Sequence, residues 1–368
     1  MTDTSPGFPP SGSAEPRRPR LSGRVWTLII SAVVTASLLA VAFLLPVPYV
    51  RLAPGPTFNV IGEIDGAQVI EIEGTETYPV SGELDMTTVS ESGGPRGGLT
   101  FVEAIAAWFN ASDAVVPREL LYPDDVTGDE IRQRGAALFS TAESDAIAAA
   151  LGYLDIPVST EVIVTAVLDD TPADGVLEPR DRIRAIDGVE VTTPQDVVDA
   201  VRAAPIGTAL ALDIERDGDP TQVRVSSVDN PDKPGTGLLG ITVGNFYTPD
   251  FIIDFTLQDI GGPSAGLVFA MGIVDKLTPD NITGGEHIAV TGTIDPDGGV
   301  GSIGGIRQKL TGARDAGAEL FLMPRGNCME AEGYVPEGLT VVPVETLADA
   351  IDALTAWRAG NELAACPA

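Results

Sequence analysis

The sequence predicts an α+β protein with two compact domains behind an N-terminal transmembrane helix. The chain has 368 residues, which is enough for two domains with hydrophobic cores of their own. One early stretch of the chain contains no charged residue and has the length of a membrane span. After it, runs with the alternation of β-strands and stretches with helical spacing follow one another.

The net charge is strongly negative along the whole chain. There are 53 acidic and 22 basic residues, which give a formal charge of −31 at pH 7. A field of this sign repels phosphate backbones, so nucleic acid is not an expected partner. The acidity is most simply interpreted as a contribution to solubility.

The first 45 residues predict a tail and an apolar span. Residues 1–24 are rich in Pro, Gly and Ser and are expected to form a disordered cytoplasmic tail. Residues 25–45 carry no charge in 21 positions. A helix of this length spans roughly 30 Å, the thickness of the hydrocarbon core.

Flanking charges predict the orientation of this span. Four arginines precede the span: Arg17, Arg18, Arg20 and Arg24. Only Arg51 follows it closely. The positive-inside rule therefore places the N-terminus in the cytoplasm and the residues after Pro46 outside. A cleavable signal peptide is the alternative, because Ala-Val-Ala at 40–42 resembles a cleavage site. The length of the apolar stretch favours a retained anchor, and the body is exported in both cases.

The region 46–155 mixes strand and helix patterns. Residues 46–56 carry four prolines and are expected to form a stiff exit from the membrane. Strand patterns follow at 68–72 and 83–89, and helical patterns at 99–110 and 144–151. Thr100 is expected to cap the first helix, with Glu103 completing a capping box.

Residues 158–228 resemble a PDZ domain of the kind associated with bacterial proteases. Strand patterns at 162–167, 182–186 and 210–216 surround an expected helix at 194–203 with Thr193 as its cap. The matching residues are T-P-A at 171–173, Gly175, Leu177, I-D-G at 186–188, Val191 and E-R-D-G at 215–218. The sequence departs from that family at 178–181, where Glu-Pro-Arg-Asp stands instead of Gly-Asp.

This resemblance implies a PDZ domain at 156–229, followed by a linker at 230–235. PDZ domains add an extended peptide to a sheet edge, so polypeptides are the expected partners. A spacer that only positions the neighbouring domain is the alternative interpretation.

The stretch G-G-P-S-A-G at 261–266 precedes an apolar helix expected at 267–277. A glycine-rich turn at a helix start directs several free backbone N–H groups to one point. Ser264 on such a turn is a candidate nucleophile, and the neighbouring residues can hold a developing oxyanion. These supporting residues are Gly262, Pro263 and Ala265. The alternative is that Ser264 only caps a core helix.

A serine nucleophile needs a base. The single histidine, His287, starts a strand, a position more typical of a surface residue. Lys309 shares one face of an expected helix with three apolar residues, Ile306, Leu310 and Ala313. An ammonium group on an inward face is poorly solvated, which lowers its pKa and favours a neutral amine able to accept a proton. The alternative is a lysine that extends to the rim of that face.

Four motifs together resemble the proteolytic domain of Lon proteases. They are G-P-S-A-G at 262–266, V-T-G at 290–292, G-x-V-x-x-I-G-G-I-x-x-K at 298–309 and V-x-V-E-T-L-x-D-A-I at 342–351. The resemblance implies a Lon-type proteolytic domain with the ribosomal protein S5 domain 2-like fold at 236–358 and a tail at 359–368. It also implies that 46–155 supplies the first strands and helices of this protease body.

The same resemblance assigns roles to individual residues. Ser264 would be the nucleophile, Lys309 the general base, and the Thr291 hydroxyl a group that orients the lysine. Two residues depart from the family: Gly261 stands where Lon proteins often carry Asp, and T-G-T at 291–293 replaces T-G-E.

Together with the anchor and Pro54-Gly55-Pro56, the chain resembles the bacterial PDZ-containing, membrane-anchored Lon-like serine proteases. The resemblance implies a serine endopeptidase that cleaves unfolded or flexible exported proteins at the outer face of the membrane, with the PDZ domain recruiting or gating substrate. The chain contains no G-x-x-x-x-G-K-[ST] pattern, so neither ATP nor another cofactor is expected. A homo-oligomer is implied by the resemblance alone. The alternatives are a membrane-anchored PDZ scaffold with an inactive protease fold, and a processing enzyme specific for one partner.

Two cysteines, Cys328 and Cys366, lie late in the chain without clustered histidines, so no zinc site is expected. Outside the cytoplasm they would form a disulfide that ties the C-terminal tail to the body, and two free thiols are the alternative. Cys328 is expected in a loop that flanks the mouth of the site, without a base of its own.

Overall fold

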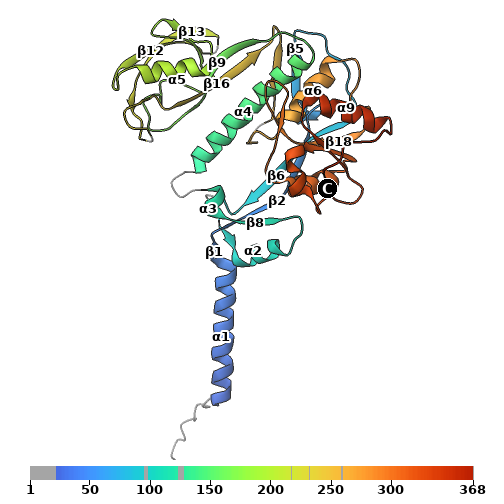
Figure 1. The fold of residues 1–368 in the computed structure, drawn as a ribbon. Coiled ribbons are helices and arrows are strands. Elements are labelled where there is room, and N and C mark those ends of the chain that lie inside the picture. Colours follow the sequence, from blue (N-terminus) through green and yellow to red (C-terminus); the bar gives the residue numbers. More distant parts are fainter. Residues whose placement is uncertain are drawn as a thin grey trace, which may run out of the picture.

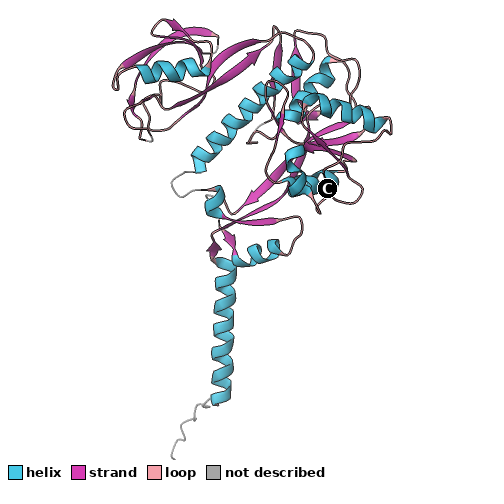
Figure 2. Ribbon diagram, in the orientation of Figure 1, coloured by secondary structure: helices cyan, strands magenta, loops and turns pink. Residues whose placement is uncertain are grey.

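A computed structural model of the chain describes residues 22–94, 98–122, 128–216, 218–231, 233–257 and 260–367. Most of the expected cytoplasmic tail lies outside these residues, including Arg17, Arg18 and Arg20. A long N-terminal helix leads to a mixed α/β body, and a smaller β-rich domain lies apart from it at the upper left of the view (Figure 1). Helices and strands alternate throughout the body (Figure 2).

Helix α1 (Gly23–Leu44) projects from the body, and none of its residues is buried (Figure 1). Among the described residues it is the one helix long and apolar enough to cross a membrane, a test that an N-terminal signal sequence also passes. It ends at Leu44 because the next residue precedes a proline, and a residue in that position disfavours the helical conformation.

The body is built on a six-stranded sheet in the order β22-β21-β18-β6-β2-β8. Its strands are β2 (Tyr49–Asn59), β6 (Glu83–Ser92), β8 (Ala114–Pro117), β18 (His287–Val290), β21 (Leu320–Pro324) and β22 (Thr340–Val344). Strands β6, β18, β21 and β22 run parallel, whereas β2 is antiparallel to both of its neighbours.

The interpretation of 46–56 as only a stiff exit from the membrane is wrong. Most of this stretch belongs to β2, which pairs with β6 on one side and β8 on the other. The pairing with β6 shifts register between Pro54 and Thr57, which accommodates two prolines that cannot donate hydrogen bonds. The membrane helix is therefore joined to the central sheet almost directly.

Helices cover both faces of this sheet. They are α4 (Gly128–Tyr153), α6 (Gly266–Leu277), α7 (Ile306–Ala316) and α9 (Leu347–Arg358). Alternate residues of the central strands enter two different cores, as the twofold period of a strand requires. Ile288 and Val290 pack with α4, α6 and α9, whereas Ala289 packs with α7. Helix α6 is buried from its first residue to Lys276, as its apolar sequence predicted.

The β-rich domain has a second sheet, in the order β13-β12-β10-β9-β16, with β11 paired to β10. Its elements are β9 (Ser159–Val167), β10 (Arg182–Ile186), β11 (Val189–Glu190), α5 (Pro194–Ala203), β12 (Ala209–Arg216), β13 (Asp219–Ser226) and β16 (Ile241–Thr248). The capping box of Thr193 and Asp196 starts α5 at the predicted residue.

The structure differs from the expected domain limits of 156–229 and 236–358. Strand β16 pairs with β9 along its length, and Leu239 lies in the core of the β-rich domain. The expected linker at 230–235 connects β14 (Val228–Asp229) with β15 (Gly237–Leu238), which pair as a hairpin. The sheet and core therefore extend beyond the proline-rich turn that suggested a boundary.

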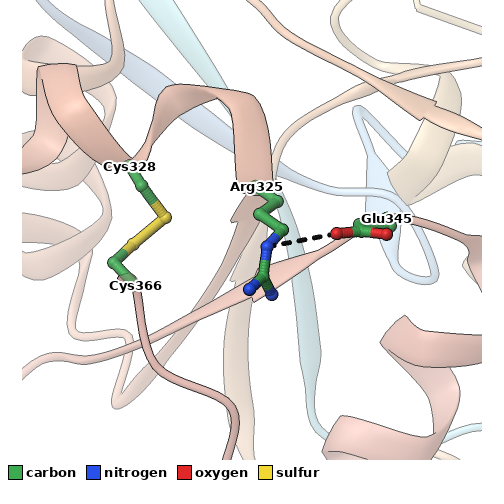
Figure 3. Close-up of a disulfide and its surroundings, with 4 residues drawn as sticks. All are labelled: Arg325, Cys328, Glu345 and Cys366. Atoms are coloured by element: carbon green, nitrogen blue, oxygen red, sulfur yellow. Dashed lines mark ion pairs between the residues drawn. A yellow bond between two sulfur atoms is a disulfide. The ribbon is translucent and has the colours of Figure 1, made fainter. Parts of the chain in front are cut away.

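The remaining elements are short, with α2 starting at the predicted Thr100–Glu103 capping box. They are β1 (Pro46–Val47), β3 (Glu63–Ile64), β4 (Ala67–Gln68), β5 (Ile70–Glu73), β7 (Leu99–Thr100), α2 (Phe101–Trp108), α3 (Arg118–Leu121), β17 (Ile252–Phe255), β19 (Thr293–Ile294), β20 (Val300–Gly301), the 3-10 helix η1 (Arg325–Asn327) and α8 (Cys328–Ala331). Cys328 and Cys366 form a disulfide, and the nearby Arg325 pairs with Glu345 (Figure 3).

Candidate active site

Ser264 lies on a tight turn directly before α6. Gly262 has a φ of +94°, in the left-handed region that favours glycine. The Gly262 N–H donates to the carbonyl of Gly135 in α4 at 3.0 Å, and the Ser264 carbonyl accepts from the Gly292 N–H at 3.1 Å. The residue that caps α6 is Ala265, so the interpretation of Ser264 as an ordinary N-cap is wrong. Its hydroxyl remains free for another partner.

That partner is the Lys309 amine. Lys309 Nζ lies 2.7 Å from Ser264 Oγ and 3.0 Å from Thr291 Oγ1. Lys309 occupies the buried face of α7, with only 3% of its surface exposed, so it does not extend to the rim. The spacing that placed it beside Ile306 and Leu310 therefore predicted its direction.

Burial changes the chemistry of this amine. Desolvation lowers the pKa of Lys309 to about 7. Within the part of the chain that the structure describes, no carboxylate forms an ion pair with it. A large fraction of the amine is thus uncharged near neutral pH, and an uncharged amine can accept the proton of a hydroxyl 2.7 Å away.

Thr291 positions both groups. Its side chain is fully buried, its Oγ1 accepts from Lys309 Nζ, and its hydroxyl donates to the Ser264 carbonyl at 3.4 Å. Its own N–H donates to the Leu322 carbonyl at 3.0 Å, which continues the sheet one residue beyond β18. The end of the central strand therefore fixes the distance between the nucleophile turn and α7.

The expected oxyanion donors need correction. Pro263 has no N–H group, and that of Gly262 is already bonded to Gly135, so both residues shape the turn instead of donating. Within the described segments, the N–H groups of Ser264 and Ala265 have no hydrogen-bond acceptor. These two amides are the donors that the turn leaves available for an oxyanion.

Ser264 and Lys309 line a cavity of about 540 Å³. Residues 87–91 of β6 form one of its walls. Four apolar side chains from separate parts of the chain line it as well: Phe58, Met86, Phe139 and Ile260. Sequence reasoning missed them because no local pattern tells which core residues border a cavity. The cavity offers an apolar subsite beside the nucleophile.

His287 lies away from this site, as its position at a strand start suggested. It begins β18, whereas Thr291 follows the end of that strand. Its Nε2 lies 2.9 Å from Asp85 Oδ2 and 3.2 Å from Glu83 Oε2. Among the described residues these three are the group that could hold a cation, and hydrogen bonds between them already account for their proximity.

Comparison with known families matches the part of the chain that carries this site to a proteolytic domain. Residues 258–356 match the model of the Lon protease (S16) C-terminal proteolytic domain. The C-terminal part of the chain is therefore similar to the proteolytic domain of Lon proteases. Its matched region contains the nucleophile turn, Thr291 and Lys309, together with α9 up to residue 356.

Individual Lon proteases are similar over the same part of the chain. The Lon protease of Buchnera aphidicola is 36% identical over 93 residues, which are 24% of this chain and 12% of that protein. The Lon protease of Clostridium beijerinckii is 37% identical over 93 residues, or 24% of this chain and 11% of that protein. The chain thus matches only about a tenth of the length of these relatives.

A PDZ domain precedes the Lon-type domain, since residues 139–226 match the PDZ family model. The PDZ domain of the SdrC-like protein from Listeria monocytogenes is 27% identical, over 23% of this chain and 86% of that one, with a TM-score of 0.21. A groove of about 300 Å³ lies between α5 and β16, lined by apolar side chains such as Val197, Val201 and Ile241. Strand β16 is the edge of this sheet, the position at which a peptide strand can be added.

Proposed function

We propose that this protein is a serine endopeptidase in which Lys309 is the general base for Ser264. The observation that carries the proposal is the 2.7 Å contact between a buried amine with a pKa of about 7 and a serine hydroxyl on the turn before α6. The Lon-type domain supports a serine peptidase as the reaction class.

The proposed reaction proceeds through an acyl-enzyme. The neutral Lys309 amine accepts the hydroxyl proton while Ser264 Oγ attacks the carbonyl carbon of the scissile peptide bond. The N–H groups of Ser264 and Ala265 stabilise the oxyanion. The Lys309 ammonium then gives its proton to the leaving amine, and the C–N bond breaks. A water molecule, deprotonated by the same amine, hydrolyses the ester and restores Ser264.

Thr291 acts in this proposal as a positioning residue. Because its hydroxyl contacts both Lys309 and the Ser264 carbonyl, Thr291→Val should lower kcat more than it raises KM. Thr291→Ser keeps the hydroxyl and should restore most of the lost rate. An equal loss in both variants would mean that Thr291 serves packing alone.

The decisive test is hydrolysis of a disordered protein substrate by the purified full chain. Ser264→Ala and Lys309→Ala should each lower kcat/KM by about 10³-fold or more. Ser92→Ala, at the exposed end of β6, is the matched control and should cleave normally. If the unaltered protein binds C-terminal peptides but cleaves no substrate, the chain is a PDZ scaffold with an inactive protease fold.

We further propose that cleavage takes place outside the cytoplasm, on a body held at the membrane by α1. The disulfide of Cys328 and Cys366 supports this, because such bonds persist in oxidising compartments. The arginines before the span support the same orientation. Protease added to spheroplasts with an intact cytoplasmic membrane should digest the body. Digestion only after that membrane is permeabilised would refute this location.

The proposal also includes hydrolysis without ATP, because the chain contains no phosphate-binding G-x-x-x-x-G-K-[ST] loop. An unfolded substrate should be cleaved at the same rate with and without nucleotide, while its tightly folded form resists. Stimulation by ATP in the purified protein would refute this part. A homo-oligomer remains a prediction from the Lon-type domain, to be checked by sedimentation in detergent.

A further inference from the structure

Helix α2 presents an apolar face that nothing in the described structure covers. Phe101, Ile105, Trp108 and Phe109 follow helical spacing on one side, with exposed fractions of 52%, 39%, 78% and 87%. An adjacent side of the helix, with Ala104 and Ala107, is buried. A contiguous group of large apolar side chains exposed to water is unfavourable in free energy and usually marks an interaction site.

The position of α2 indicates what contacts this face. Strand β1 begins directly after Leu45, the cap of α1. Its Pro46 pairs with Thr100, the residue that caps α2. Gly98 allows the close approach, since a side chain there would collide with Pro46. Helix α2 therefore starts directly beside the end of the apolar span. It lies across that end, close to the point where α1 meets the body (Figure 1).

The direction of the exposed face follows from the packing of α2. The helix packs against β2 and β8, which lie between α2 and the rest of the body (Figure 1). The aromatic residues of α2 remain exposed beside this contact. With α1 in a bilayer, the 22 residues of the span correspond to the hydrocarbon thickness, and its end lies at the boundary with the headgroups.

We propose that α2 is an interfacial helix that inserts its aromatic face into the outer surface of the same bilayer. Trp and other aromatic side chains favour the headgroup region, where a ring is buried and its polar edge stays hydrated. The one charged residue of α2, Glu103, bonds its carboxylate to the N–H and hydroxyl of Thr100 at the helix start. The contact is thus apolar and does not require anionic lipid.

This contact would give the protein two attachments to the membrane instead of one. A single span leaves a body free to tilt and rotate, whereas a helix fixed across its end orients the attached sheet. Because β2 and β6 lead from this end to the wall of the cavity at residues 87–91, the orientation of the catalytic cavity to the membrane would also be set.

The inference rests on the proposed insertion of α1, and tryptophan fluorescence separates the two. The chain has three tryptophans, Trp26 in α1, Trp108 in α2 and Trp357 in α9. Full-length variants that keep one tryptophan, with phenylalanine at the other two positions, are reconstituted in vesicles of zwitterionic phosphatidylcholine. Quenching by lipids brominated on the acyl chains and by aqueous iodide is measured for each.

The Trp108 variant should be quenched at least about twofold by shallow brominated lipid and shielded from iodide. The matched control places the single tryptophan at an exposed position of α8 by Met329→Trp, which should respond to iodide only. Retained cleavage of a disordered substrate checks the fold of every variant.

The quenching of Trp108 and Trp26 separates the proposal for α2 from the proposed anchor. Iodide access to Trp108 together with lipid quenching of Trp26 overturns the α2 proposal and leaves the anchor in place. Trp108 that is shielded from iodide but insensitive to brominated lipid points to a second protein copy and also overturns it. If brominated lipid does not quench Trp26, the proposed insertion of α1 is itself refuted.

Discussion

Lys309 loses most of its hydration when the domain folds. Its surroundings supply two hydroxyl groups and no carboxylate among the described residues, and burial lowers its pKa to about 7. In the unfolded chain the same amine has its ordinary pKa of 10.5. Between these values the unfolded state binds more protons than the folded state, so this residue makes stability rise with pH from about 7 toward 10.5.

Replacing Lys309 by an uncharged residue should therefore stabilise the folded protein, although the proposed activity would be lost. Lys309→Met keeps the length of the side chain without its charge and should raise the free energy of unfolding at pH 7 by about 0.5–2 kcal/mol. The gain should shrink toward pH 10, where the folded protein holds the lysine neutral and the unfolded chain, with a pKa of 10.5, begins to lose the same proton. Urea unfolding at the two pH values measures it. Destabilisation that does not depend on pH would show that Lys309 carries no desolvation cost.

The proximity of Ser264 and Lys309 was predictable at this scale, but the surroundings of the pair were not. The glycine-rich turn and the spacing of α7 identified Ser264 and Lys309, because both signals are local. The hydrogen bond from the Gly262 N–H to the Gly135 carbonyl depends on where α4 packs, and no local sequence pattern predicts that packing. The same holds for Phe139 and Ile260, which reach the cavity from distant parts of the chain.

At the scale of elements, the nucleophile turn depends on backbone conformation more than on space. A Cβ on Gly262 would meet no atom within 4 Å, yet its φ of +94° is unfavourable for other residues. Gly262→Ala should cost about 1–2 kcal/mol locally and displace Ser264, so kcat/KM should fall at least tenfold.

Gly207 provides the control for this prediction. It also has a positive φ and open space around it, but it lies in the PDZ domain. Gly207→Ala should carry a similar conformational cost and leave cleavage of a short peptide unchanged. Equal activity loss in the two variants would contradict a specific role for the turn.

The disulfide stabilises the segment behind the cavity. Asn327, next to Cys328, donates to the Ile303 carbonyl at 2.8 Å and accepts from the Ile303 N–H at 3.0 Å. Ile303 in turn lines the catalytic cavity. The bond closes a loop with a sequence separation of 38 residues.

Removing this crosslink should lower stability without abolishing catalysis. Cys328→Ala with Cys366→Ala should cost about 2–4 kcal/mol, read as a lower Tm by calorimetry. Reduction of the unaltered protein should lower its Tm by the same amount and have no effect on the double variant. An unchanged Tm after reduction would contradict the structural role of the bond.

Two errors at this scale have separate local causes. Helix α4 was predicted only at 144–151, because Gly135 and a run of polar residues interrupt its apolar pattern. Strand β16 was assigned to the wrong domain, because a proline-rich turn resembles a linker. The capping box of α2 and the Thr193 cap of α5 were predicted correctly, since each signal lies within a few consecutive residues.

At the scale of the whole molecule, α4 joins the PDZ domain to the nucleophile turn. Near its start, the Gly135 carbonyl accepts from the Gly262 N–H. Near its end, the Ser144 hydroxyl oxygen accepts from the Tyr247 N–H of β16 at 3.2 Å. A peptide that is added to the edge of β16 would thus contact a strand that is bonded to the same helix as the turn of Ser264.

A PDZ ligand should therefore change the rate of cleavage through Ser144. We expect a saturating C-terminal peptide to alter kcat for a short substrate about 5-fold or more in the unaltered protein, and less in Ser144→Ala. Thr141→Ala is the control, because the Thr141 hydroxyl bonds only within α4, to the Ala137 carbonyl. The same response in all three proteins would mean that the PDZ domain recruits substrate without gating the site.

The most direct test of a neutral Lys309 is the pH dependence of Ser264 modification by a serine-reactive phosphonate, followed by mass spectrometry. The rate constant should rise through a single titration with a midpoint near the Lys309 pKa of about 7, and labelling should disappear in Lys309→Met. A rate that is independent of pH from 5 to 9, or that persists without the lysine, would contradict the account.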